Sequence, residues 1–366
     1  MAKGRLGFLA VAASLIVILT IASILVLNTT SPISKEDDQW VVAKVNDEPI
    51  LFHEFKAGMM DHRTETIVYF HEKHDADANH KGFWQQTFGE EVPLEVLKEK
   101  ALKHLTGIKV QQMLAKEMGV LDDLSYEAFL EQLNKENKVR KERLARKEVI
   151  FGPQQYDEKT YFNYVFSNMV IDLKKALAED RFVYSDHDLV MYYETIKERN
   201  FKIQDTITVS RLFVNYSTES SENLPTEAKA LEEVELFKKR LNDRDAFEQA
   251  AKEITGRNDA VFGYEEHRFE SQNRKEDLVY HDSLINRAAL LAEGEISEPF
   301  KEDYKYCFSI AMVTERIDHG YEKFEEVKEL VELLFIDEQY NDLIDQLLDQ
   351  SRLIIHQDVY DKVRIP

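Results

Sequence analysis

Two kinds of hydrophobic pattern alternate along this chain and predict a mostly helical protein with a few short strands. In two stretches, Val41–Ile50 around an Asn46-Asp47 turn and Ile207–Val214, apolar and polar residues alternate as in strands. Elsewhere apolar residues recur every three to four positions, as on the buried side of an amphipathic helix. These helical segments are 52–60, 94–118, 125–149, 157–180, 186–200 and 324–348.

Residues 207–316 are expected to form a small domain of their own. The strand at Ile207–Val214 is followed by two predicted helices, which the polar run Asn242–Asp245 separates. A turn at Phe262–Tyr264, a short helix at Asp282–Ala292 and a strand at Phe308–Thr314 come next. The predicted order is β, two helices, β, helix, β, in a domain of ordinary size.

This block resembles a parvulin-type peptidyl-prolyl cis-trans isomerase domain. Leu290–Pro299 and Ile310–Arg316 are similar to two motifs of that family, and Phe247–Ala251 is similar to a third. The resemblance implies a proline-binding groove whose chemistry needs no covalent step. It also implies an α+β fold for the whole block.

The positions that carry the chemistry depart from the family pattern. By resemblance, Arg211 and Ser309 stand where the family has two histidines, and Asp259 is the nearest candidate for its polar loop residue. A permanent cation at Arg211 cannot accept a hydrogen bond, so it should turn outward or pair with an acid such as Asp259. The implied proline pocket, whose apolar members could equally be core residues, consists of Phe262, Tyr280, Leu284 and, at its rim, His281.

The flanking segments resemble SurA- and PrsA-like chaperones. The phrase Val41–Ile50 is similar to the entry of those proteins, and Tyr192–Glu194 is similar to their linker. In that family the C-terminal helix and strand return to the N-terminal domain, so Val41–Val45 should pair with Leu353–Ile355. The expected division is an anchor at 1–28, a tether at 29–40, a helical chaperone domain at 41–204, the parvulin-like domain at 205–317, and 318–366 completing the chaperone domain.

An uncharged apolar run at Leu6–Leu27 predicts a transmembrane helix. Its 22 residues are enough to cross a hydrocarbon core of about 30 Å, and Lys3 and Arg5 precede it. The positive-inside rule then places the N-terminus in the cytoplasm and the remainder outside, at the cell membrane. A cleaved signal peptide is the alternative. The single cysteine, Cys307, excludes an intramolecular disulfide and lies too far from the run for a lipid anchor.

Charge and the remaining polar clusters narrow the list of partners. The chain has 47 Lys and Arg against 69 Asp and Glu, a net charge of −22, which argues against nucleic acid. His71, His74 and His80 could hold a metal together with neighbouring acids, but a solvated polar loop is the preferred interpretation. No metal and no cofactor are expected.

The sequence therefore predicts a membrane-anchored extracytoplasmic foldase or chaperone. Its expected partners are unfolded or proline-containing exported polypeptides, and its isomerase activity is expected to be weak or lost. One alternative is an active parvulin-type isomerase, and another is a non-catalytic structural or assembly partner of a membrane complex. A homodimer is a possible assembly, but the sequence does not determine the oligomeric state.

Overall fold

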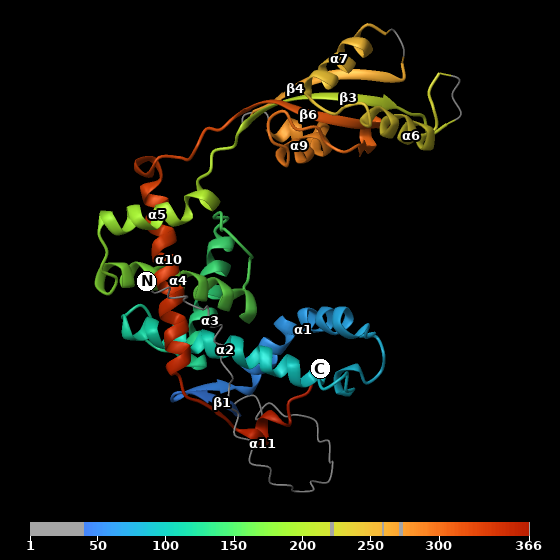
Figure 1. Cartoon of the computed structure of the whole chain (residues 1–366). Helices are drawn as coiled ribbons and strands as arrows, with labels where there is room; N and C mark the ends of the chain where they lie inside the picture. Colours follow the sequence, from blue (N-terminus) through green and yellow to red (C-terminus); the bar gives the residue numbers. More distant parts are fainter. Residues whose placement is uncertain (1–39, 220–222, 258–259, 271–273, 366) are drawn as a thin grey trace, which may run out of the picture. The chain divides into compact units, whose positions relative to one another are not determined.

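The computed structural model describes residues 40–219, 223–257, 260–270 and 274–365 (Figure 1). The described chain divides into two compact units. One holds the residues up to Leu114 together with those from Gln346 onward, and the other holds Ala115–Asp345.

A three-stranded sheet joins the two ends of the chain within the first unit. Its order is β2-β1-β7, with β1 at Val41–Val45, β2 at Glu48–Leu51 and β7 at Leu353–Ile355. The β1–β2 turn has Asn46 in the left-handed region (φ 54°), which asparagine tolerates well. Antiparallel pairing of β1 with β7 confirms the predicted contact between these segments.

Helix α1 (Phe52–His74) packs beside this sheet, and helix α2 (Pro93–Glu117) lies against α1. They come close where Gly58 faces Leu105, since a Cβ at Gly58 would lie 3.1 Å from the Leu105 side chain. Beyond that crossing, the end of α1, the short helix η2 (Phe83–Gln85) and the start of α2 enclose an aromatic cluster around Phe70. Helix α1 is longer than predicted and includes His71 and His74, which were expected in a loop. The short helix α11 (Gln357–Tyr360) follows β7.

The helices of the second unit begin at the residues that the sequence predicts. Ser125 caps α3 (Tyr126–Ala145), Asp157 caps α4 (Glu158–Asp180), and Ser185 caps α5 (Asp186–Asn200). In each case the side-chain oxygen accepts a hydrogen bond from a backbone N–H that the helix leaves unpaired. The C-terminal helix α10 (Phe324–Gln350) contributes Val331 to a core that also contains residues of α5.

The same unit contains the predicted α+β domain, built on a four-stranded antiparallel sheet. The strand order is β4-β3-β6-β5, with the two long strands in the centre. Their bounds are β3 Thr206–Asn215, β4 Phe262–Phe269, β5 Phe300–Glu302 and β6 Cys307–Ile317. The helices are α6 Glu227–Lys238, α7 Arg244–Thr255, α8 Arg274–Tyr280, α9 Asp282–Ala289 and η4 Asp303–Lys305.

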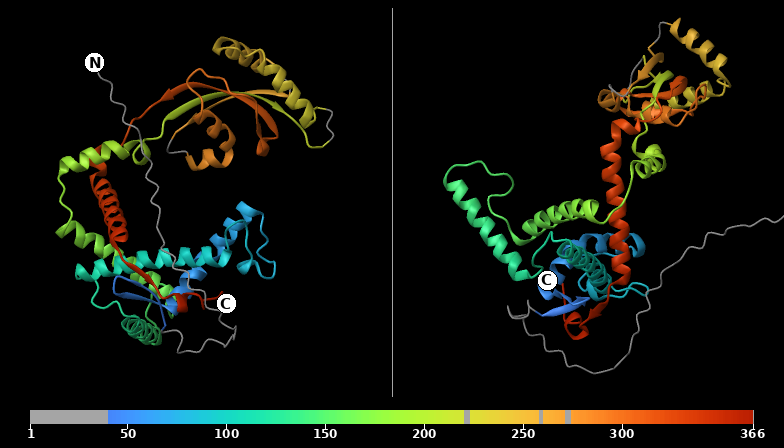
Figure 2. Two further views of the ribbon diagram at one scale, coloured as in Figure 1. Left: turned by 60° about the horizontal axis from the view of Figure 1, so that its bottom comes forward. Right: turned by 90° about the vertical axis from the view of Figure 1, so that its left-hand side faces the viewer.

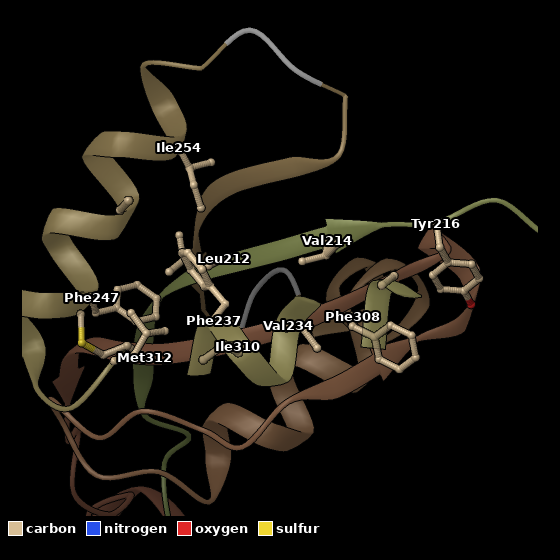
Figure 3. Packing of buried hydrophobic residues seen from close by; sticks show 13 residues of the cluster. Leu212, Val214, Tyr216, Val234, Phe237, Phe247, Ile254, Phe308, Ile310 and Met312 are labelled. Carbon is tan, nitrogen blue, oxygen red and sulfur yellow. The ribbon is translucent and has the colours of Figure 1, made fainter. Parts of the chain in front are cut away.

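The two faces of this sheet are covered by different helices. Residues of even number on β3, such as Leu212 and Val214, pack with α6 and α7 in one core (Figure 3). Residues of odd number, such as Ile207 and Val209, pack with α9 in a second core. This follows from the two-residue period of a strand. The predicted turn at Phe262–Tyr264 is instead the start of β4.

One part of the predicted fold class, the transmembrane helix, is corrected by the structure. In the part of the chain that the structure describes, helices are never both long enough and apolar enough to span a membrane. Even α10, with 27 residues, carries acidic side chains in successive turns, whereas a span needs about 20 mostly apolar residues. The predicted span, Leu6–Leu27, lies outside the described residues. The structure supports a mostly helical fold with two small sheets.

Candidate functional site

The central strands bring Arg211 and Ser309 to one face of the sheet. Arg211 is on β3 and lies opposite Ala311 of β6, while Ser309 lies opposite Phe213. Arg211, Phe213 and Ser309 therefore share the face that α9 covers further along the strands. Two of the three predicted catalytic positions are thus neighbours, and the third, Asp259, lies outside the described residues.

A buried ion network surrounds Arg211, which is only 3% exposed. Its Nη1 donates to the carboxylate of Glu302, which is 4% exposed. Its Nε and Nη2 donate to Oε2 of Glu265 at 3.1 and 2.6 Å, and its guanidinium lies 4.4 Å from the Phe213 ring centroid. Of the two expected outcomes, pairing with an acid is the one observed.

The hydroxyl of Ser309 is part of the same network. It donates to Oε1 of Glu302, the oxygen that also accepts from Arg211. Cys307 lies beside them, with its Sγ 3.8 Å from the Ser309 Oγ. Burial and the charge of Glu302 raise the pKa of the Cys307 thiol, so it stays protonated and a poor nucleophile near neutral pH.

The surroundings of Arg211 and Glu265 favour the ionised form of both side chains. Burial alone would raise the pKa of Glu265, but the hydrogen bond and the charge of Arg211 outweigh burial and lower it. Burial opposes the charged form of Arg211, yet Glu302 and Glu265 raise its pKa further. Arg211 and Glu265 therefore remain ionised at physiological pH, and neither is suited to exchange protons there.

Two histidines do lie near this face, His281, which the resemblance places at the rim of the pocket, and His267, which it did not indicate. His267 is on β4, opposite Val209, and its Nε2 is 2.8 Å from Oδ1 of Asp277 on α8. His281, between α8 and α9, has its ring centroid 4.2 Å from that of His267. Its Nδ1 lies 3.0 Å from the Nζ of Lys305. Since an ammonium can only donate, that nitrogen of His281 accepts the hydrogen bond.

The four predicted pocket residues do not line one pocket. Phe262 packs against Phe237 in the core of the opposite face, with ring centroids 6.1 Å apart. Leu284 is fully buried in the core under α9. Tyr280 is 68% exposed and is next in sequence to His281.

Sequence reasoning missed Glu302, Glu265, His267 and Lys305. Alternation along β4 could have placed Glu265 and His267 on one face, because they are two residues apart. No local signal pairs Glu302 with Arg211, which is 91 positions away in the chain. That pairing depends on β5 lying beside β6.

Exposed apolar side chains lie on two elements near the network, on α8, whose Asp277 contacts His267, and on η4, which follows Glu302. They are Leu278, Val279 and Tyr280 of α8 and Tyr304 of η4, which are 43%, 63%, 68% and 87% exposed. The contact between Lys305 and His281 holds the two elements together. We call these four residues the apolar rim. Side chains of this kind, grouped around a polar site, can bind apolar segments of another chain.

Comparisons with known proteins give similar solved structures only. No family model matches the chain, and no curated protein matches it. One similar structure comes from a study of two structurally related SurA-like chaperones of Campylobacter jejuni. It is 14% identical, covers 86% of this chain and 98% of its own, and has a TM-score of 0.31.

Two further similar structures are PrsA proteins. The foldase PrsA of Streptococcus pneumoniae is 15% identical, with 72% of this chain and 92% of that chain covered and a TM-score of 0.23. The peptidylprolyl isomerase PrsA of Bacillus anthracis is 16% identical, with 68% and 94% covered and a TM-score of 0.20. The predicted resemblance to SurA-like and PrsA proteins is thus confirmed. Because all these TM-scores are below 0.5, they assign no role to any residue of this chain.

Proposed function

We propose that this protein is a chaperone or foldase that binds unfolded polypeptides, and that its parvulin-like domain binds them without accelerating prolyl isomerisation. The observation that carries the proposal is the closed ion network of Arg211, Glu302 and Ser309. It fills the place where the resemblance implies two histidines. The apolar rim beside it remains exposed and supplies the binding surface.

The network is poorly suited to catalysing rotation about an X–Pro bond. That rotation has a barrier of about 20 kcal/mol, and a thousandfold acceleration needs about 4 kcal/mol of stabilisation given only to the twisted amide. Arg211 is committed to two carboxylates, and the Ser309 hydroxyl is committed to Glu302. Turning Arg211 toward a substrate would break its buried ion pair with Glu302, which costs about 3 to 5 kcal/mol. Turning the Ser309 hydroxyl away would remove a hydrogen bond from the same buried carboxylate.

The deciding experiment measures isomerisation and chaperone activity on the same full-length protein. We expect no acceleration in a proline-containing tetrapeptide assay, and suppressed aggregation of an unfolded client. Acceleration within tenfold of an active parvulin at equal concentration would refute the loss of activity and support the isomerase alternative. Absence of both activities would refute the chaperone proposal itself.

The apolar rim gives this experiment matched variants. Tyr280→Ser and Tyr304→Ser should weaken aggregation suppression, because each removes an exposed aromatic ring that a client can cover. Leu236→Ser is the control, since Leu236 is 49% exposed on α6 in the same domain. Equal loss in all three variants would show that the rim has no special role.

We further propose that the clients are exported polypeptides and that the protein acts outside the cytoplasm. Crosslinking in cells followed by isolation of the adducts should give many unrelated exported proteins. A single stoichiometric partner would favour the structural alternative instead. Protease added to cells with an intact cytoplasmic membrane should degrade residues 41–366, and protection of that segment would contradict the placement.

A further inference from the structure

The loop that joins α3 to α4 holds two apolar side chains in water. Val149 is 76% exposed and Phe151 is 88% exposed. The loop extends beyond the end of α3 before it returns to α4 (Figure 2, right). Single exposed apolar residues are common on protein surfaces, so their exposure alone carries no conclusion. The way in which this loop is held is more informative.

Two side chains of α3 fasten the backbone of the loop. Arg140 donates through Nη1 to the carbonyl oxygens of Phe151 and Pro153 at 3.0 and 2.9 Å, and through Nη2 to that of Phe151 at 2.8 Å. Asn137 makes both backbone hydrogen bonds of Tyr156, at 2.9 and 2.8 Å. The carbonyl groups around Phe151 are therefore fixed to a helix, whereas its ring is left in solvent.

The local conformation adds to this fixation. Gly152 has φ +80°, a value that residues with a Cβ rarely adopt. Tyr156 is buried in a core with Leu133 of α3 and Tyr161 of α4, and its ring lies 4.4 Å from the Arg140 guanidinium. The loop is thus anchored at its inner end, and its outer end cannot fold back to bury Phe151 without breaking these contacts.

We call the part of the loop around Val149 and Phe151 the tip. The charge around the tip is opposite in sign to that of the chain as a whole. Residues 138–148 contain six basic and two acidic side chains, a local charge of +4 in a chain of net charge −22. Glu148 pairs with both Arg143 and Arg146, at 3.1 and 2.6 Å. The exposed basic residues next to the tip are Lys138, Lys141, Arg143, Arg146 and Lys147.

We propose that this tip docks on an anionic lipid surface. Phe151 and Val149 would enter the boundary between headgroups and acyl chains, while the basic side chains lie against the headgroups. Exposed apolar side chains flanked by basic ones match an anionic bilayer, in which apolar groups lie below negatively charged headgroups. The remaining acidic surface is repelled by anionic lipid, so contact is restricted to the tip. Docking of the tip on a lipid surface does not depend on the proposed function.

The test uses the full chain and a dye placed at the tip. Gln154→Cys carries a dye whose emission shifts to the blue when it leaves water, and Glu179→Cys carries the same dye on α4 as a control. Cys307 is 1% exposed and stays unlabelled in the folded protein. With vesicles of phosphatidylglycerol and phosphatidylcholine, the dye at the tip should shift and the control dye should not. Vesicles of phosphatidylcholine alone should produce little shift.

Further substitutions in the protein labelled at Gln154→Cys identify the side chains that bind the vesicles. Phe151→Ser should raise the lipid concentration needed for half the shift roughly tenfold. The double variant Lys141→Gln with Lys147→Gln should raise this lipid concentration about 25-fold. Each basic side chain near an anionic surface strengthens binding about fivefold, and the variant removes two. The matched controls are Val183→Ser, which removes a side chain that is 98% exposed elsewhere, and Lys81→Gln with Lys103→Gln, which removes two exposed charges.

Four results would overturn the proposal. The first is no shift at the tip with anionic vesicles, and the second is an equal shift with neutral ones. The third is an unchanged titration for Phe151→Ser or for the double lysine variant. The fourth is a shift at the tip caused by an unfolded polypeptide and not by vesicles, which would assign the tip to client binding.

Discussion

Removing the charge of Arg211 should destabilise the α+β domain strongly, and removing Glu302 as well should restore its stability. Both side chains are almost fully buried, at 3% and 4% exposed, and they form a direct ion pair. Arg211→Met keeps a chain of similar length but leaves Glu302 with the Ser309 hydroxyl and with Lys305, whose Nζ is 3.8 Å from Oε2. The carboxylate then lacks its main counterion.

The expected magnitude follows from this burial. Breaking a buried ion pair by removing one partner costs about 3 to 5 kcal/mol, because the other charge stays uncompensated in a poorly solvated site. Replacing both partners by apolar residues of similar size is often neutral. We therefore expect Arg211→Met to cost about 3 kcal/mol, and Arg211→Met with Glu302→Leu to fall within about 1 kcal/mol of the original chain.

Hydrogen exchange is the suitable assay because a chain with two compact units need not unfold in one step. A cost of about 3 kcal/mol should speed exchange of the β3 and β6 amides roughly a hundredfold. Glu265→Gln is the matched control. The Glu265 side chain is 54% exposed, so its pair with Arg211 should contribute less than about 1 kcal/mol.

Two results would refute this reasoning. If Arg211→Met left exchange of β3 and β6 unchanged, the ion pair would contribute no stability. If the double variant exchanged as fast as the single one, the loss would come from packing of the Arg211 chain and not from an unpaired Glu302.

Three further predictions concern other parts of the molecule. Deleting residues 320–366 removes β7 and α10, so hydrogen exchange should show the helices of 41–180 unfolded while the sheet of 205–317 stays protected. Gly58→Ala should lower the free energy of unfolding by about 1 to 3 kcal/mol, because its Cβ would crowd Leu105. Gly107→Ala, which has free space around it, should raise that free energy by up to about 1 kcal/mol. Thermal unfolding measures both. Acidification should release α8 and α9. Burial, Lys305, His267 and Arg211 lower the pKa of His281, so the folded domain favours its neutral ring. The stability that the neutral ring contributes is fully present above pH 6.5, the usual pKa of histidine, and is lost as the pH falls below that value.

Each of these predictions has its own contrary result. Cooperative melting of the first unit after the deletion would show that it does not need β7. Equal effects of the two glycine variants would show that α1 and α2 can separate slightly at no cost. Protection of α8 and α9 that falls with pH just as steeply in His281→Gln would show that His281 is not the group responsible.

The sequence by itself determined the features that depend on neighbouring residues. Ser125, Asp157 and Ser185 mark the helix starts because a capping side chain bonds backbone groups two or three positions away. Asn46 marks the first hairpin for a similarly local reason, its tolerance of positive φ. In 205–317 the periodicity indicates β3, the two helices that follow it, α9 and β6, but it does not indicate α8 or β5. The pairing of β1 with β7 follows from the need of two short strands for partners.

Only the tertiary structure decided what those elements place together. The sequence indicated that Arg211 needs an acid, but the acids are Glu302, which β5 brings beside β6, and Glu265, which β4 brings beside β3. The family resemblance implies that Phe262 and Leu284 share one pocket, yet they lie in cores on opposite faces of the sheet. The physical reason is that a one-residue difference in strand register reverses the face of a side chain, and register is set by packing between segments far apart in the chain.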